Sequence, residues 1–137
     1  MSDKRIENLN VREEQPLIAP TELKKKYPLT ENIIKTVMDG QTTIKNILNK
    51  KDKRILVVVG PCSIHDISAA KEYAKKLKIL ADELKDTVYL VMRVYFEKPR
   101  TTTGWQGLIN DPHLDNTCDV NEGLHVCREL LTYVAEL

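Results

Sequence analysis

Positively charged and hydroxyl side chains gather in one short stretch of the sequence, directly after an apolar run. Arg93, Lys98 and Arg100 supply the cations, and Thr101 and Thr102 supply the hydroxyl groups. Guanidinium forks, an ammonium group and hydroxyls on one loop are the groups with which proteins hold a phosphate or a carboxylate. This stretch therefore predicts a binding site for a small anionic ligand.

A solvated basic loop, with its cations paired to Glu97 and Asp111, is the alternative interpretation of the same stretch. Pro99 stiffens the chain between two of the cations, and two glycines follow a few residues later. The glycine spacing matches neither a Walker loop nor a dinucleotide fingerprint. The residues alone leave both interpretations open.

A second candidate group lies in the segment GPCSIHD at residues 60–66, which contains Cys62 and His65. Cys-x-x-His offers two ligands to one metal ion, or a thiolate beside a base. Further ligands do not follow nearby in the sequence. Two alternatives stay open: Cys62 is a small buried residue and His65 a hydrogen-bonding loop residue, or the chain is a small metal-binding protein without catalysis.

Two apolar runs that precede these groups have the character of strands. Residues 55–59 form a continuous aliphatic run, as in a strand buried on both faces of a parallel sheet, and residues 88–94 form the second strand. Helices are predicted over residues 21–27, with Thr21 as the cap, over 30–48 and 68–85, and from 119 or 121 onward. This order predicts a parallel pair with a right-handed crossover. In such folds sites form at the carboxyl ends of the strands, where both candidate groups lie.

The helical spacing also predicts which side chains are buried. The expected apolar face of the third helix is Ala70, Tyr73, Leu77, Leu80 and Leu84, and that of the last helix is Leu124, Cys127, Leu131 and Val134.

Length and composition describe one ordinary globular domain. The chain has 137 residues, of which 42% are hydrophobic and 30% charged, with a net charge of +1. This charge gives no field that would recruit nucleic acid or a membrane surface, and no apolar segment is long enough to span a bilayer. The three cysteines lack disulfide spacing, which favours a reducing, cytoplasmic location.

Three stretches resemble the class I 3-deoxy-D-arabino-heptulosonate 7-phosphate synthases: LVVVGPCSIHD at 56–66, KEYAKKL at 71–77 and VMRVYFEKPRTTTGWQGLINDPHLD at 91–115. The resemblance implies an α/β fold, the N-terminal part of a (β/α)8 TIM barrel preceded by a helical extension. Residues 1–50 would be the arm and helix for oligomerisation and regulation, and 51–137 the first two βα units. A barrel needs about 250 residues, so we expect an incomplete barrel that is inactive alone.

The reaction implied by the resemblance is the first step of the shikimate pathway, which leads to aromatic amino acids. It is an aldol-like condensation of phosphoenolpyruvate with D-erythrose 4-phosphate that releases phosphate. A divalent metal ion, Mn²⁺ or Fe²⁺, polarises the aldehyde in such an enzyme. By the same resemblance Cys62 is one metal ligand, and the remaining ligands lie outside this chain.

The resemblance also assigns substrate-binding roles. Arg93 would bind phosphoenolpyruvate, and Lys98 would lie between the two substrates as the catalytic acid–base group. Erythrose 4-phosphate would be held by Pro99, Arg100, Thr101 and Thr102.

Partners follow from the family in the same way. It implies a homo-oligomer and feedback by an aromatic amino acid, with tyrosine favoured by the arm sequence ENLNVREEQPLIAPTEL at residues 7–23. The alternative function is a non-catalytic regulatory fragment that binds full-length synthase subunits.

Overall fold

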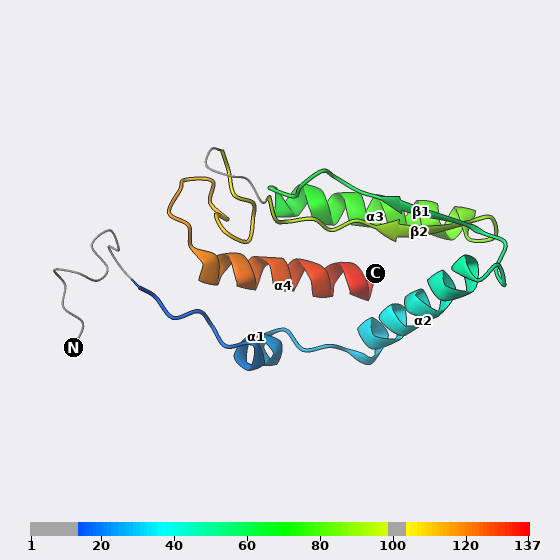
Figure 1. Ribbon diagram of the computed structural model, residues 1–137, viewed down its shortest axis with the longest axis horizontal. Coiled ribbons are helices and arrows are strands. Elements are labelled where there is room, and N and C mark those ends of the chain that lie inside the picture. The colour runs from blue at the N-terminus through cyan, green and yellow to red at the C-terminus, as the bar shows by residue number, and fades with distance from the viewer. Residues whose placement is uncertain (1–13, 99–103) are drawn as a thin grey trace.

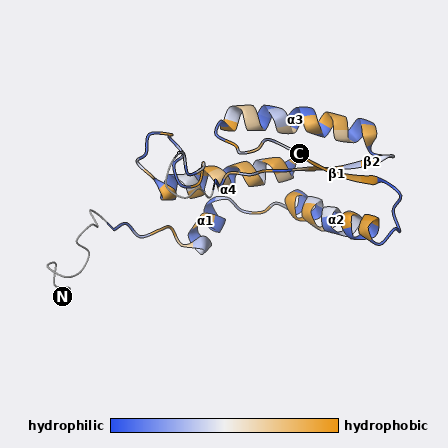
Figure 2. Ribbon diagram, turned by 45° about the horizontal axis from the view of Figure 1, so that its top comes forward, coloured by the Kyte–Doolittle hydropathy of each residue, from blue (hydrophilic) through white to orange (hydrophobic). Residues whose placement is uncertain are grey.

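The structure is a computed structural model that describes residues 14–98 and 104–137 (Figure 1). Its elements in chain order are α1 (Pro20–Lys26), α2 (Glu31–Leu48), β1 (Ile55–Val59), α3 (Ile67–Leu84), β2 (Val88–Met92) and α4 (Val120–Glu136). In Figure 2 the strands run between α3 above and α2 below, and β1 is hydrophobic along its length. No helix within the described ranges is long and apolar enough to cross a lipid bilayer.

The two strands pair in parallel, as the order of elements predicts. Ile55 lies opposite Val88, and Val59 lies opposite Met92. The second strand ends before the predicted residue 94, because β1 has already stopped and offers no further ladder partner. Beyond the ladder the Arg93 amide still donates to the Val59 carbonyl at 2.8 Å.

The first turn of α3 is held by a side-chain cap. The Asp66 carboxylate accepts hydrogen bonds from the Ala69 amide at 3.0 Å and from the Ser68 hydroxyl at 2.7 Å. The bond from the Ala69 amide, followed by that from Ser68, holds the pKa of Asp66 below its usual range. A carboxylate at this position satisfies an amide that the helix itself cannot.

The buried face of α3 is narrower than its sequence pattern predicts. Ala70 and Ala74 are buried, whereas Tyr73, Leu80 and Leu84 are exposed. The burial of Ala70 confirms one member of the predicted stripe, whereas Ala74 was not predicted to be buried. The buried side of α3 therefore allows close approach and contributes little apolar area.

The core lies where α4 meets the loop that follows β2. It consists of Ile64, Ala70, Leu108, Cys127 and Leu130. The predicted face of α4 is wrong in one position: Leu130 is fully buried, whereas Leu131 is 38% exposed. The loop is the cause, because a Cβ at Gly123 would lie 2.0 Å from the Ile109 carbonyl oxygen. The helix thus turns Gly123, Cys127 and Leu130 toward the loop.

The start of α1 also differs from its prediction. The helix begins at Pro20 with Ala19 as the N-cap, and the cap has no side-chain hydrogen bond. Thr21 lies inside the first turn, since proline at the first helical position fixes the helical φ and lacks the amide that would need a cap. By contrast, Thr30 caps α2 by accepting from the Ile33 amide at 3.1 Å, and the predicted start of that helix is confirmed.

The described part of the N-terminal arm, residues 14–19, is fastened to the first turn of α4. Asn121 accepts from the Ile18 amide at 2.8 Å and donates to the Pro16 carbonyl at 3.1 Å. Asn121 therefore pairs with one amide and one carbonyl of the arm backbone, as a neighbouring strand would. In Figure 1 the arm passes below α4 and leads into α1, which lies on the same side of α4.

We expect Asn121→Ala to release the arm while leaving the core intact. The Ile18 amide loses its acceptor, so its hydrogen exchange should accelerate by about tenfold, the scale of one net hydrogen bond. Asn49→Ala, at the exposed end of α2, is the matched control and should leave Ile18 unchanged. An Ile18 amide that exchanges at the same rate in the Asn121 variant would show that the arm is held by other contacts.

The Asp66 cap predicts a pH dependence of stability. Because its pKa is lowered in the folded state, the carboxylate stabilises the fold above the ordinary carboxyl range, and this stabilisation is lost as pH falls through the folded pKa. Asp66→Ala should lower the Tm at pH 7, and the difference from the parent chain should shrink in acid. Asp66→Asn keeps a capping oxygen without the titration and should melt above the parent chain in acid. Parallel Tm profiles of all three proteins would contradict this prediction.

Candidate functional site

Cys62 and His65 lie in the turn between β1 and α3, at the carboxyl end of the first strand. The Cys62 thiol is exposed, so the alternative that it is a small buried residue is wrong. His65 is exposed as well, and its ring meets the Trp105 ring edge-on, with centroids 6.4 Å apart and planes at 89°. The His65 contact joins the turn after β1 to the loop after β2.

Arg93 follows directly after β2 and reaches back to the turn that carries Cys62. Its Nη1 donates to the Pro61 carbonyl at 2.8 Å, and its guanidinium lies 4.5 Å from the centroid of the Tyr95 ring. The sequence predicted that this guanidinium would find an anion from the protein or a ligand. In the described structure a carbonyl and an aromatic face orient it, and the side chain stays exposed at the strand end.

Lys98 is positioned through its backbone. The Lys98 amide donates to the Gln106 carbonyl at 3.2 Å, and the Ile109 amide donates to the Phe96 carbonyl at 3.3 Å. Gly107 lies between them with φ +102°, and a Cβ there would be 2.6 Å from the Lys98 nitrogen and 2.8 Å from the Phe96 oxygen. Only glycine fits both this conformation and this space.

Four of the predicted substrate-binding residues, Pro99, Arg100, Thr101 and Thr102, lie outside the described residues. Their roles stay predictions. The described ends of this loop, Lys98 and Gly104, flank them, and Figure 1 shows both strand-end loops at the same end of the sheet, beside the start of α4. Cys62, Arg93 and Lys98 are thus brought to one end of the molecule, as the topology predicts.

Asp111 is a feature of this region that the sequence pattern did not indicate. Its side chain was expected in a solvated turn, but the residue is only 2% exposed. One carboxylate oxygen accepts from the Asn116 amide at 3.3 Å, and the other has no partner among the described residues. The Asp111 carbonyl accepts from the Trp105 indole at 2.8 Å. An Asn-Asp-Pro sequence signals a turn and carries no signal of burial.

The described residues do not form a complete metal site. They contain no group of three or more His, Cys, Asp or Glu side chains that could hold a metal ion. Burial, and then the charge of Glu97, raise the pKa of the Cys127 thiol to about 12, so Cys127 remains protonated. An exposed thiol at a strand end suits a divalent transition metal, provided that further ligands come from elsewhere.

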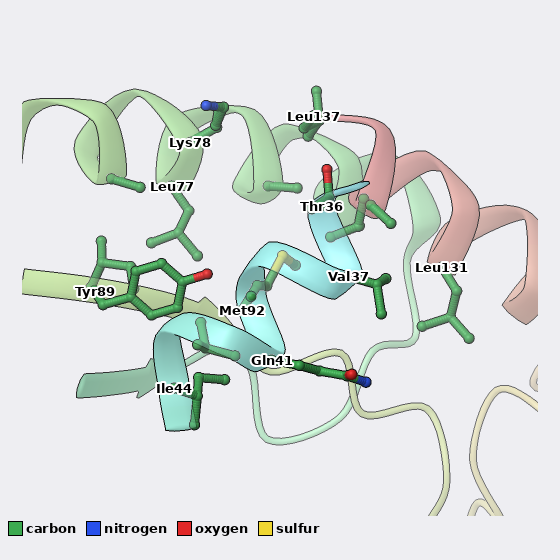
Figure 3. Close-up of a pocket in the computed structure, with 17 residues that line it drawn as sticks. Thr36, Val37, Gln41, Ile44, Leu77, Lys78, Tyr89, Met92, Leu131 and Leu137 are labelled. Carbon is green, nitrogen blue, oxygen red and sulfur yellow. The ribbon is translucent and has the colours of Figure 1, made fainter. Parts of the chain in front are cut away.

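An apolar hollow of about 540 Å³ lies among α2, α3, α4 and β2, and its lining reaches Met92 at the end of β2. Figure 3 shows its wall, with Val37 and Ile44 from α2, Leu77 from α3 and Leu131 from α4. None of the described predicted site residues lines it. The hollow is therefore an apolar space between the helices and β2, and it is separate from the polar side chains of the candidate site.

The sequence model of the DAHP synthetase I family matches residues 23–135. A phospho-2-dehydro-3-deoxyheptonate aldolase of Escherichia coli, described as Phe-sensitive, is 54% identical over 125 residues. The Tyr-sensitive enzyme of the same organism is 51% identical over 126 residues, and the Trp-sensitive enzyme is 47% identical over 133 residues.

A solved structure agrees with these matches. The phospho-2-dehydro-3-deoxyheptonate aldolase of Francisella tularensis superposes with a TM-score of 0.88 at 46% identity, over 93% of this chain and 37% of that one. The alignment with the E. coli Phe-sensitive relative likewise covers 91% of this chain and 36% of that relative. This sequence therefore spans a little over a third of the length of its relatives. Within that span the strand-end motifs, the parallel pair and the family match coincide, and the chain belongs to the DAHP synthetase I family.

Proposed function

We propose that the protein to which this sequence belongs condenses phosphoenolpyruvate with D-erythrose 4-phosphate, giving 3-deoxy-D-arabino-heptulosonate 7-phosphate and phosphate. The observation that carries the proposal is that Cys62, Arg93 and Lys98 all follow the carboxyl ends of a parallel strand pair, inside the family match. The names of the relatives support the same reaction. This step opens the shikimate pathway.

The reaction requires groups that bind two anionic substrates and transfer one proton. A carbon–carbon bond forms between C3 of phosphoenolpyruvate and the aldehyde carbon, water adds at C2, and phosphate leaves. The Arg93 guanidinium, oriented by Pro61 and Tyr95, is suited to the carboxylate or phosphate of phosphoenolpyruvate. The Lys98 ammonium can neutralise charge between the substrates and donate the proton that the new hydroxyl group requires.

A divalent metal ion, when bound, would polarise the aldehyde carbonyl. Among the described residues, Cys62 is suited to hold it, as an exposed thiol at the end of β1. The other ligands would come from parts of the protein outside this sequence. Mn²⁺ or Fe²⁺ remains our expectation, and the thiolate suits Fe²⁺ better than the harder Mn²⁺, which prefers oxygen ligands.

The N-terminal arm is proposed to carry regulation and assembly. Its described part is tied to the first turn of α4 through Asn121, so a ligand or a neighbouring subunit that moves the arm acts on the helix that packs against the Ile109 segment. The relatives are named for sensitivity to phenylalanine, tyrosine or tryptophan. We propose an aromatic amino acid as effector, with tyrosine favoured, and a homo-oligomeric assembly.

A chimera tests the proposed reaction. This chain is joined to the part of the E. coli Phe-sensitive relative that follows the aligned region, and phosphate release is measured with both substrates and Mn²⁺. We expect turnover, and Lys98→Met should lower kcat by about 100-fold or more, the scale of a lost acid–base group. Lys51→Met, in the exposed connector after α2, is the matched control and should keep the parent rate.

The 137 residues alone should show no turnover under the same conditions, because their described ranges contain no group of three or more His, Cys, Asp or Glu side chains that could hold the metal ion. Turnover by the isolated chain would contradict the proposal that its site needs residues from elsewhere. A folded chimera without activity would contradict the proposed reaction itself.

The role of Cys62 predicts a change in metal affinity. Cys62→Ser in the chimera should weaken Mn²⁺ or Co²⁺ binding, measured by calorimetry, by about tenfold or more. Loss of a residue that only hydrogen-bonds to a metal ligand already lowers metal affinity by about that factor. Cys118→Ser removes another exposed thiol and should leave the affinity unchanged. Equal affinity in both variants would remove Cys62 from the metal site.

A further inference from the structure

Residues 104–111, which follow the gap in the described residues, support the backbone of Lys98. We call this segment the brace. Its Gln106 carbonyl accepts from the Lys98 amide, and its Ile109 amide donates to the Phe96 carbonyl. Between these two bonds Gly107 lies directly against the backbone of residues 96–98. The lysine backbone is therefore fixed by the brace and not by the β1–β2 ladder, which ended at Met92.

Hydrogen bonds between nearby residues close the brace into a turn. The amides of Asn110 and Asp111 both donate to the Gly107 carbonyl, at 3.1 and 2.9 Å, and the Asn110 side chain donates to the Gln106 carbonyl at 3.1 Å. Leu108 anchors this turn in the core at 2% exposure. The geometry of Gly107 against Lys98 thus depends on how tightly the turn closes.

Trp105 connects the two ends of the brace. Its indole Nε1 donates to the Asp111 carbonyl at 2.8 Å, and its ring packs against the core cluster. On the other side the same ring meets the edge of His65, in the turn that carries Cys62. One side chain therefore contacts the loops at the ends of both strands.

The bond from Trp105 has few substitutes, because Asp111 is buried. One of its carboxylate oxygens already lacks a partner among the described residues. Removing the indole donor would leave the carbonyl of the same residue with only the long hydrogen bond from the Leu114 amide, at 3.4 Å, and a poorly satisfied buried acceptor is costly. The brace would relax to let water reach Asp111.

We propose that Trp105 is a positioning residue: it holds the brace closed and thereby sets the place of Lys98 relative to the turn of Cys62. The proposal rests on the proposed function in one respect, that Lys98 acts on the substrates. Displacement of a reacting group by about 1 Å can cost on the order of 100-fold in rate. Trp105 itself takes no part in the chemistry.

The first experiment measures amide hydrogen exchange by NMR in the 137-residue chain. In Trp105→Phe, which keeps an aromatic ring and loses the N–H donor, the Lys98 and Ile109 amides should exchange about tenfold faster, while the β1–β2 ladder amides keep their rates. Tyr73→Phe, an aromatic change on the exposed side of α3, should alter neither set. Unchanged exchange at Lys98 and Ile109, or equal acceleration of every amide, would overturn the proposal.

The second experiment measures kinetics in the chimera described above. Trp105→Phe should lower kcat by about 10- to 100-fold with KM values changed by less than about threefold. In a Lys98→Met background the same change should have almost no further effect, since the group that it positions is gone. A Trp105→Phe chimera with the parent kcat, or a full additional loss in the Lys98→Met background, would overturn the positioning role.

The two experiments separate this proposal from the proposed function. If the unmodified chimera has no activity, the proposed reaction fails, and the exchange rates alone decide whether Trp105 holds Lys98. If the chimera is active and both Trp105 results are negative, the reaction stands and the positioning role falls.

Discussion

The close approach of Gly107 to the backbone of residues 96–98 is the constraint on which the site depends. No Cβ fits in that space, and the positive φ is one that other residues adopt only with strain. A second close approach, of Gly123 to Ile109, brings α4 against the same segment. Through these two contacts residues 104–111 are packed between the backbone of residues 96–98 and the last helix, and the backbone of Lys98 is held in place.

The rigidity is local, and the rest of the fold is open. The sheet has two strands in the described ranges, and apolar residues such as Ile55 and Val58 on β1 and Met38 on α2 are more than half exposed. Two strands alone bury little apolar surface, so the packing of this chain depends on its helices and on the loop after β2. The relatives are nearly three times as long as the matched span. The well-packed part of this chain is the end that carries the candidate site, which is consistent with a site completed by other parts of a larger protein.

The sequence allowed the arrangement of elements to be predicted because its signals were local. The aliphatic run at 55–59, the caps at Thr30 and Asp119 and the Gly60-Pro61 stop each act within a few residues. Parallel pairing then placed Cys62 and Arg93 at one end of the sheet. Family motifs supplied roles that periodicity does not contain.

What could not be predicted depends on contacts between distant residues. Spacing favoured Leu131 as a core residue, but the loop at Ile109 turns α4 so that Leu130 is buried. The burial of Asp111 arises in the same way, from a loop that folds back on itself through Trp105. Neither result has a signal in residue type or spacing, because each depends on which surface the loop occupies.

The central claim is that the turn after β1 and the loop after β2 form one anion-binding site. The most direct test is a titration of the ¹⁵N-labelled chain with phosphoenolpyruvate, followed by NMR. We expect the signals of residues 62–65, of Arg93 and Lys98 and of the Trp105 indole to shift together along one binding curve. Shifts confined to the apolar hollow among α2, α3 and α4, or scattered over the surface lysines, would contradict it.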